Sequence, residues 1–443
     1  MRLNLLFFLA FLLYSGNAWA QLVYKLPEVK DTALFRQGTS RTAWLLNNGK
    51  EIRILVYGQS ISAQEWWQEV KSFLEMRYPQ ARIHMANKAI GGFSSERLKL
   101  TVDNDVISFY PDLVLFHDYG NEEDYETIIQ TIRKRTTAEI AVQTDHMAVQ
   151  AQTFHDKHSE EWLPALCRKY GLALLDVRAG WKGYLNQNNL KIEDLLTDGV
   201  HLNAQGNHLM AGIITTYLKN LPQGTPSTHV KTLHAGTDFR SGKRKLRLPV
   251  RGNRVDVVWK ANPDPAPPLR MRIDKEKPSS FSDCYYYTRP ALDTTSFFLK
   301  NIGQLLAMDL RHITSEEAWQ LTVEKIDSVQ QRVWFSVHSS ASGFEGKGTS
   351  DSLFVSRSGK VAIRPSYWFL RKNEGDFAQF RWLQPGYVLQ WQIKSMCRDA
   401  VQPQPAATTT FVQGLRNGPH QLVLKCAALR QVKAIVVYEP PLQ

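Results

Sequence analysis

Residues 52–60 read IRILVYGQS, a mostly apolar run that ends in Gly58, Gln59 and Ser60. A short run that is apolar on both faces is typical of a buried parallel strand, and a glycine beside a polar residue marks a tight turn after it. Helical spacing begins soon after, at Glu65. The stretch therefore predicts a strand, a turn and a helix, with the Ser60 hydroxyl at the positive end of that helix.

The same alternation of strand and helix continues to about residue 221. The predicted strands are Ile52–Tyr57, Ala81–Ala86, Leu113–His117, Glu139–Gln143 and Leu172–Val177, and the predicted helices include Glu65–Tyr78, Tyr125–Lys134 and Trp162–Tyr170. Such alternation indicates a doubly wound α/β fold with a parallel sheet, in which ligands bind at the carboxyl ends of the strands.

Polar residues at these strand ends are candidates for chemistry. A serine before a helix is often only an N-cap, and Ser60 alone would favour that interpretation. The second strand leads into Asn87–Gly92, where paired glycines let the backbone offer an N–H to a bound group. The third leads into Gly120-Asn121, which indicates either an amide beside the sheet edge or an asparagine in a left-handed turn.

Residues 197–206, TDGVHLNAQG, add an acid and a base. Asp198 stands three residues before His201, so one turn can bring its carboxylate against Nδ1 while Nε2 points away. Such a pair also occurs as a simple loop hydrogen bond or in a metal site. An α/β chain with Ser60 early and Asp198 and His201 late follows the Ser, Asp, His order of one class of hydrolases, which favours nucleophilic catalysis.

Together these pieces resemble the four motif blocks of the SGNH/GDSL hydrolase superfamily. In the family's order, across about residues 51–221, they are Gly58-Gln59-Ser60, Asn87–Gly92, Gly120-Asn121 and Asp198–Asn203. The resemblance implies a three-layer α/β/α fold with Ser60 as nucleophile, His201 as base and Asp198 as the residue that orients it. It also implies an oxyanion hole made by the N–H groups of Ser60 and Gly92 and the side chain of Asn121, and it implies no cofactor or metal.

Two residues depart from the family pattern: Gln59 stands where an Asp is usual, and Glu122 follows Asn121 where an Asp is frequent. Neither position supplies a reacting group, and a similar Gly-Gln-Ser occurs in some sialate and other carbohydrate esterases of related groups. The resemblance therefore implies a serine esterase that removes acetyl or other short acyl groups, and we expect a carbohydrate substrate. The alternatives are a lipid or aryl esterase, a polysaccharide acyltransferase with the same triad, and a non-catalytic protein that binds glycan or the cell envelope.

The N-terminus predicts export. Arg2, the apolar run Leu5–Leu13 and the small-x-small sequence Ala18-Trp19-Ala20 indicate a cleaved secretory signal peptide over residues 1–20, hence a secreted or periplasmic protein. The apolar run is too short for a membrane span, and no later segment is long enough. We expect a lead-in over residues 21–50, the catalytic domain over 51–221, a linker over 222–232 and a β-rich domain over 233–443.

Positive charge is concentrated in the second half of the chain. The 443 residues carry a net charge of +12, and residues 226–443 hold 31 Lys and Arg against 18 Asp and Glu. Short alternating runs there predict an antiparallel β-sandwich or jelly roll, with carbohydrate binding and packing between domains as its two candidate roles. This distribution favours an anionic glycan or envelope surface over nucleic acid as its partner. Aromatic residues that could stack on sugars, or else form the core, are Tyr285, Tyr286, Tyr287, Trp368 and Trp391.

Two further groups of polar residues carry weaker signals. Thr144-Asp145-His146 and the run from His155 to His158 lack the spacing of a structural zinc site, so we interpret both as loop residues, the first at the substrate rim. No phosphate loop or dinucleotide fingerprint occurs. Export permits a disulfide from Cys397 to Cys284 or Cys426, between which the sequence does not choose.

Overall fold

The structure is a computed structural model that describes residues 32–240, 245–292, 305–327, 329–370, 383–425 and 427–442. The expected signal peptide lies outside these ranges. Among the described residues, no helix combines the length and the apolar character needed to cross a membrane.

A parallel sheet with strand order β2-β1-β3-β4-β5 occupies the centre of the N-terminal part, and it confirms the predicted α/β class. Its strands are β1 (Glu51–Gly58), β2 (Arg82–Asn87), β3 (Leu113–His117), β4 (Glu139–Gln143) and β5 (Ala173–Leu175). The strand order reverses between β1 and β3, and in open α/β sheets the crevice at such a reversal is where ligands bind. Ser60 follows β1 at this point.

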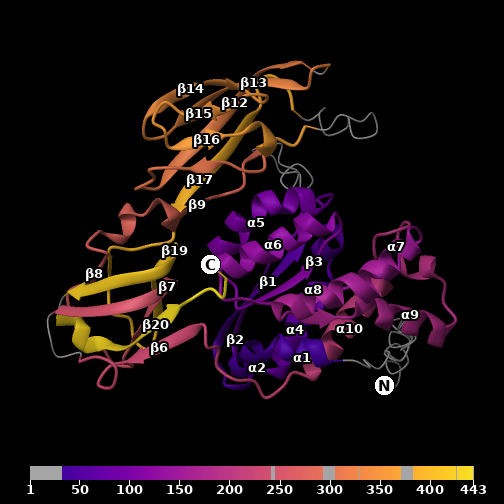
Figure 1. Cartoon of the computed structure of the whole chain (residues 1–443), viewed down its shortest axis with the longest axis horizontal. Helices are drawn as coiled ribbons and strands as arrows, with labels where there is room; N and C mark the ends of the chain where they lie inside the picture. Colours follow the sequence, from indigo (N-terminus) through magenta and orange to yellow (C-terminus); the bar gives the residue numbers. More distant parts are fainter. Residues whose placement is uncertain are drawn as a thin grey trace, which may run out of the picture.

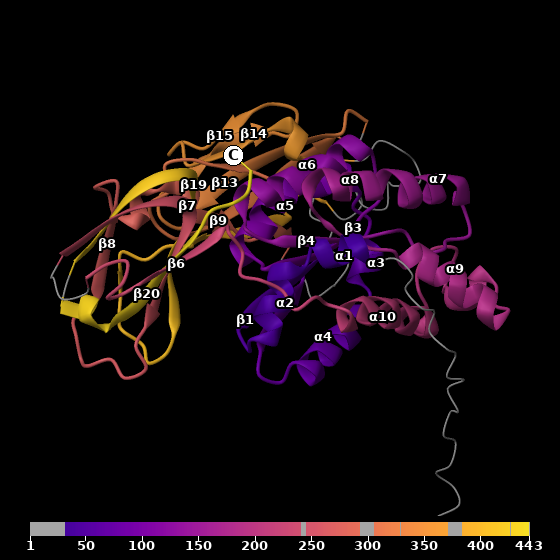
Figure 2. The same cartoon turned by 60° about the horizontal axis from the view of Figure 1, so that its bottom comes forward.

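Helices cover both faces of the sheet (Figure 2). Because β1 is buried on both sides, Ile54 and Val56 pack into one core and Leu55 and Tyr57 into the other. The helices are α1 (Ala33–Gln37), α2 (Ser40–Asn47), α3 (Ser60–Ala63), α4 (Trp66–Arg77), α5 (Ser95–Phe109), α6 (Glu122–Arg135), α7 (Gln152–Lys157), the π-turn η1 (His158–Trp162), α8 (Leu163–Tyr170), α9 (Val177–Asn188), the 3-10 turn η2 (Ile192–Leu195) and α10 (Ala204–Lys219). Helices α4, α9 and α10 face the first core, and α5, α6 and α8 the second. Phe35, Leu45 and Leu46, in the expected lead-in, also belong to the first core.

The C-terminal part is all-β and antiparallel, as the alternating runs predicted (Figure 1). One sheet has the order β18-β8-β19-β7-β20-β6. Its strands are β6 (Val230–His234), β7 (Lys245–Trp259), β8 (Leu269–Ile273), β18 (Ala400–Val401), β19 (Thr408–Lys425) and β20 (Val432–Tyr438). Strand β6 begins inside the stretch that we expected to be a linker.

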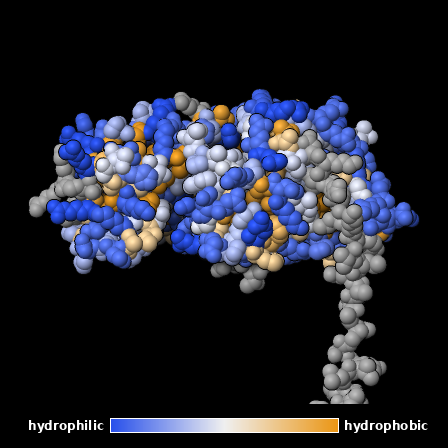
Figure 3. Space-filling model, turned by 90° about the horizontal axis from the view of Figure 1, so that it is seen from below, coloured by the Kyte–Doolittle hydropathy of each residue, from blue (hydrophilic) through white to orange (hydrophobic). Residues whose placement is uncertain are grey.

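Between β8 and β18 the chain builds a second β unit with its own hydrophobic core. Its larger sheet contains β9 (Tyr285–Tyr287), β10 (Ala291–Leu292), β12 (Glu317–Asp327), β13 (Arg332–Ser339), β14 (Gly343–Thr349) and β17 (Val388–Ser395), and its smaller one β11 (Asp309–Leu310), β15 (Phe354–Val355) and β16 (Val361–Ile363). Tyr285, Tyr287, Trp368 and Trp391 belong to this core, and Trp391 also lines a cavity of the same unit. The face of the whole molecule that is seen from below in Figure 3 is mostly hydrophilic, with small apolar groups scattered over it.

Two cysteines that pack in the core of the first β sheet lie side by side without a disulfide. Cys284 and Cys397 are both free, and hydrogen bonding to the Cys397 thiol raises the pKa of Cys284. Cys426 lies outside the described residues.

Helix α5 fastens the α/β part to the β-rich part. The Asn104 side chain accepts from the Tyr287 backbone N–H at 3.0 Å and donates to its carbonyl at 2.7 Å. Arg289 donates to both carboxylate oxygens of the neighbouring Asp105, which is buried. These contacts hold β9 and the residues just after it against α5. The two parts are therefore joined by polar contacts as well as by the linker.

A buried ion pair near this junction allows a test of stability. Arg254 and Asp256 form a bidentate pair, and the guanidinium of Arg254 lies over the rings of Tyr110 and Tyr438 at 4.8 and 4.7 Å. Arg254→Ala is expected to lower the free energy of unfolding by about 3–5 kcal/mol, because it leaves a buried carboxylate unpaired. Denaturant titration checks this, and the double variant Arg254→Met with Asp256→Leu should lose less. An unchanged midpoint for Arg254→Ala would contradict the expectation.

Candidate active site

The turn after β1 requires a glycine. Gly58 has φ +144°, and a Cβ placed there would lie 1.8 Å from the carbonyl oxygen of His117 on the neighbouring strand β3. The close approach brings the ends of β1 and β3 together. Gln59 then occupies the N-cap of α3, and its Oε1 accepts the N–H of Ile61 at 3.2 Å. The helix is therefore capped by Gln59, and the Ser60 hydroxyl is not needed for that purpose.

Ser60, His201 and Asp198 form one hydrogen-bonded line. His201 Nε2 lies 3.0 Å from Ser60 Oγ, and His201 Nδ1 lies 2.8 Å from Asp198 Oδ2. The line is open to solvent, since the side chains of His201 and Asp198 are 43% and 57% exposed. A serine hydroxyl, an imidazole and a carboxylate in this order have the geometry of an activated nucleophile with its base and orienting acid.

Asp198 is held by the backbone as well as by His201. Its Oδ1 accepts the N–H groups of Val200 and His201, each at 2.7 Å. The hydrogen bonds from the His201 N–H, the His201 ring and the Val200 N–H lower the pKa of Asp198 to about 2. The carboxylate is therefore ionised throughout the neutral range, although it is exposed.

Two side chains from elsewhere fix this loop in place. Gln64, just after α3, donates to the carbonyl of Leu202 at 2.9 Å and accepts its N–H at 3.0 Å. His146 Nε2 donates to the carbonyl of Val200 at 2.8 Å. Burial lowers the pKa of His146 to about 3, so the ring is neutral near pH 7. The role of Gln64 was not predicted from the sequence, where the only signal for it is that a polar residue stands close to Ser60.

The oxyanion donors are less complete than the resemblance implies. The expected backbone donor is Gly92, but Gly91 is the glycine whose added Cβ would approach Ser60, at 3.9 Å from Ser60 Cβ. A Cβ added to Gly92 would have no atom of another residue within 4 Å. Asn121 caps α6: its Oδ1 accepts the N–H of Asp124, and its Nδ2 donates to the carboxylates of Glu96 and Asp124 at 3.1 and 2.8 Å. With both amide hydrogens occupied, Asn121 offers none to an oxyanion in this arrangement.

The two groups of polar residues that we interpreted as loop residues are placed differently by the structure: Thr144-Asp145-His146 is buried rather than at a rim, and residues 155–158 lie in α7 and η1 rather than in a loop. Asp145, His146 and His158 are buried, and His117, His155 and His158 surround the Asp145 carboxylate. Within the described ranges, no group of three or more His, Cys, Asp or Glu has an arrangement that could hold a metal ion. His117 and His155 are hydrogen-bonded to the Asp145 carboxylate at 3.1 and 2.6 Å.

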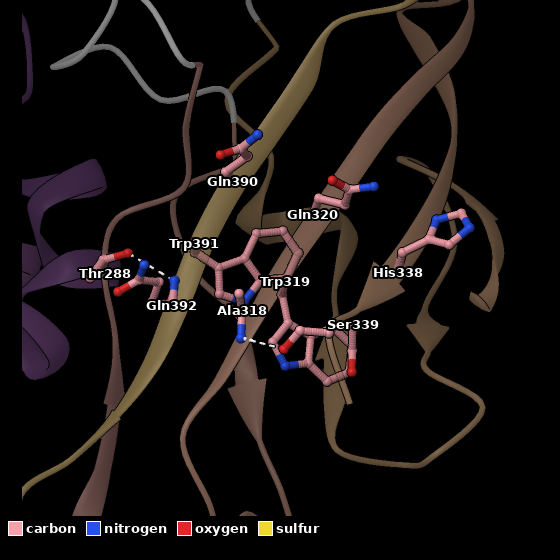
Figure 4. A pocket seen from close by; sticks show the side chains of 10 residues that line it. Thr288, Ala318, Trp319, Gln320, His338, Ser339, Gln390, Trp391 and Gln392 are labelled. Atoms are coloured by element: carbon pink, nitrogen blue, oxygen red, sulfur yellow. Dashed lines mark hydrogen bonds between the residues drawn. The ribbon is translucent and has the colours of Figure 1, made fainter. Parts of the chain in front are cut away.

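A cavity of about 460 Å³ lies in the second β unit, on strands β12, β13 and β17 (Figure 4). It includes the uncharged polar side chains of Gln320, Gln390 and Gln392, and none of the triad residues line it.

No family model matches the chain, and no curated protein matches it in sequence. Solved structures do resemble it. One is a two-domain esterase active on acetylated mannans, at 14% identity over 94% of this chain and 98% of that chain, with a TM-score of 0.35. Another is an acetylxylan esterase from Geobacillus stearothermophilus, at 17% identity over 39% of this chain and 96% of that chain, with a TM-score of 0.34. Because these scores are low, the fold is assigned from the sheet topology.

Proposed function

We propose that the protein is a serine esterase of the SGNH/GDSL type that removes acetyl or similarly short acyl groups from a carbohydrate. The observation that carries the proposal is the line of hydrogen bonds from Ser60 through His201 to Asp198 at the topological reversal of the sheet. A protein that only binds glycans would not require a serine hydroxyl that is hydrogen-bonded to a histidine and an aspartate.

The chemistry follows from the geometry. Ser60 Oγ attacks the ester carbonyl carbon while its proton passes to His201 Nε2, and His201 gives that proton to the alcohol oxygen as the C–O bond breaks. Water then attacks the acyl group, losing a proton to His201, and the acid leaves as Ser60 regains its proton. The N–H groups of Ser60 and Gly92 are the proposed oxyanion donors, each worth about 3 kcal/mol of barrier.

Exposure of the triad supports hydrolysis of an accessible ester. A half-exposed His201 admits water to the acyl-enzyme, which favours hydrolysis over transfer to another sugar. It also allows the acyl group of a polymer to reach Ser60 without a deep channel. Export through the predicted signal peptide, and contact of the basic β-rich part with an anionic glycan or envelope surface, belong to the same proposal.

The test compares substrates. Purified protein is expected to release acetate from acetylated polysaccharides and to hydrolyse aryl esters at rates that fall as the acyl chain grows from acetyl to octanoyl. Acetate assay and absorbance of the released phenol measure the two. A preference for long acyl chains would favour a lipid esterase instead, and no hydrolysis of any ester would overturn the proposal.

A further inference from the structure

A series of hydrogen-bonded side chains leads away from Ser60 and does not include His201. Gln59 Nε2 lies 3.2 Å from His117 Nδ1, His117 Nε2 lies 3.1 Å from Asp145 Oδ1, and Asp145 Oδ2 lies 2.6 Å from His155 Nδ1. Gln59, His117 and Asp145 are each at most 3% exposed. The proposed triad chemistry uses none of the four.

The donors and acceptors fix the orientation of Gln59. Because Oε1 accepts the Ile61 N–H, Nε2 must be the group that faces His117. Nε2 only donates, so His117 Nδ1 must accept, which leaves the ring proton on Nε2 to be donated to Asp145. Burial alone would raise the pKa of Asp145, but the hydrogen bonds from His117 and His155, with the nearby His158 ring, outweigh burial and hold it well below its ordinary value. The Asp145 carboxylate, as an anionic acceptor, thus selects the tautomer of His117 that carries its proton on Nε2.

Gln59 in turn contacts the nucleophile. The Ser60 hydroxyl lies 2.7 Å from Gln59 Oε1 and 3.0 Å from His201 Nε2, and its single proton can serve only one of these acceptors at a time. Both are in reach from one position of Oγ. Rotation of the O–H bond alone therefore moves the proton from Gln59 to His201, without any movement of the oxygen.

We propose that Gln59 is a positioning residue that holds Ser60 Oγ in its reactive place, and that His117 and Asp145 act through Gln59 by fixing the orientation of its amide. The inference rests on the proposed function of Ser60. Losing the contact frees Ser60 to turn to other rotamers, and a misplacement of about 1 Å at a reacting atom costs up to roughly 100-fold in rate.

A fluorophosphonate probe tests this without knowledge of the natural ester. Ser60 Oγ forms a bond to phosphorus, fluoride leaves, and the serine proton passes to His201. Gln59→Leu and His117→Phe are each expected to slow labelling about 10- to 100-fold. Because both act on the same contact, the double variant should be no slower than the slower single variant by more than about twofold. Tyr125→Phe is the matched control, since its buried hydroxyl has no hydrogen-bond partner among the described residues and its loss should leave the rate unchanged.

The outcomes separate the two proposals. If the wild-type protein is not labelled at Ser60, the proposed function fails. If the wild type is labelled but the effects of the two single variants multiply, or Gln59→Leu labels at the wild-type rate, the inference fails. Should His117→Phe not fold, ¹H–¹⁵N NMR of the histidine-labelled wild type decides: a proton on Nε2 and none on Nδ1 of His117 supports this series of hydrogen bonds, and the opposite tautomer overturns it.

Discussion

Ser60→Ala is expected to lower kcat for an acetyl ester by at least about 10⁴-fold, because it removes the atom that forms the acyl bond and leaves only the residual catalysis of binding and oxyanion donors. The fold should survive, since Gln59 and not Ser60 caps α3 and only a partly buried hydroxyl is lost. Initial rates with an aryl acetate measure the first effect, and the thermal unfolding midpoint measures the second.

Ser62→Ala is the matched control for this experiment. It makes the same change two residues further along α3, where the Ser62 hydroxyl donates only to the backbone carbonyl of His117 at 3.3 Å. It is expected to keep the activity. Equal activity of Ser60→Ala and the wild type would refute the assignment of the nucleophile, whereas loss of activity in both variants would point to damage of the turn after β1.

The sequence predicts those features of the site that depend on short stretches of chain. A strand that is apolar on both faces fixes the position of Gly58, and carboxyl ends of neighbouring parallel strands meet at one edge, so Ser60 can be placed from the pattern alone. The contact between Asp198 and His201 is likewise local, because the turn between them is closed by the Asp198 carboxylate.

Features that depend on packing between distant residues could not be predicted in this way. The cluster around Asp145 brings together His117 from the end of β3 and His155 from α7. The sequence around either histidine does not indicate that its ring contacts Asp145. Asn121 illustrates local competition: an asparagine before a helix rich in acidic residues caps that helix, and the cap uses the amide that the resemblance assigns to the oxyanion. The two cores of the β-rich part were also missed, because alternation predicts strands but not which strands share a core.

Asp198→Asn is expected to lower kcat about 10³-fold with little change in KM. An asparagine can keep Oδ1 in place as acceptor for the two backbone N–H groups, but Nδ2 replaces the oxygen that faces His201 Nδ1. Nδ2 only donates, so Nδ1 must accept and the ring proton moves to Nε2, which faces Ser60. The base is then lost in its resting form. A fully buried aspartate in this role is worth about 10⁴-fold, and we expect less here because solvent reaches the exposed pair.

The control is Asp194→Asn, the same substitution four residues earlier. The exposed Asp194 carboxylate accepts only the N–H of Lys191 at 2.8 Å, a bond that an asparagine oxygen can keep, so both kcat and KM should stay at the wild-type values.

Because the pKa of Asp198 is about 2, the wild-type carboxylate stays ionised down to strongly acidic pH. Protonation of Asp198 should therefore make no contribution to the difference between wild type and Asp198→Asn from about pH 5 to 8. A variant that keeps the wild-type kcat would show that His201 takes its orientation from elsewhere, and a raised KM at unchanged kcat would assign Asp198 to substrate binding.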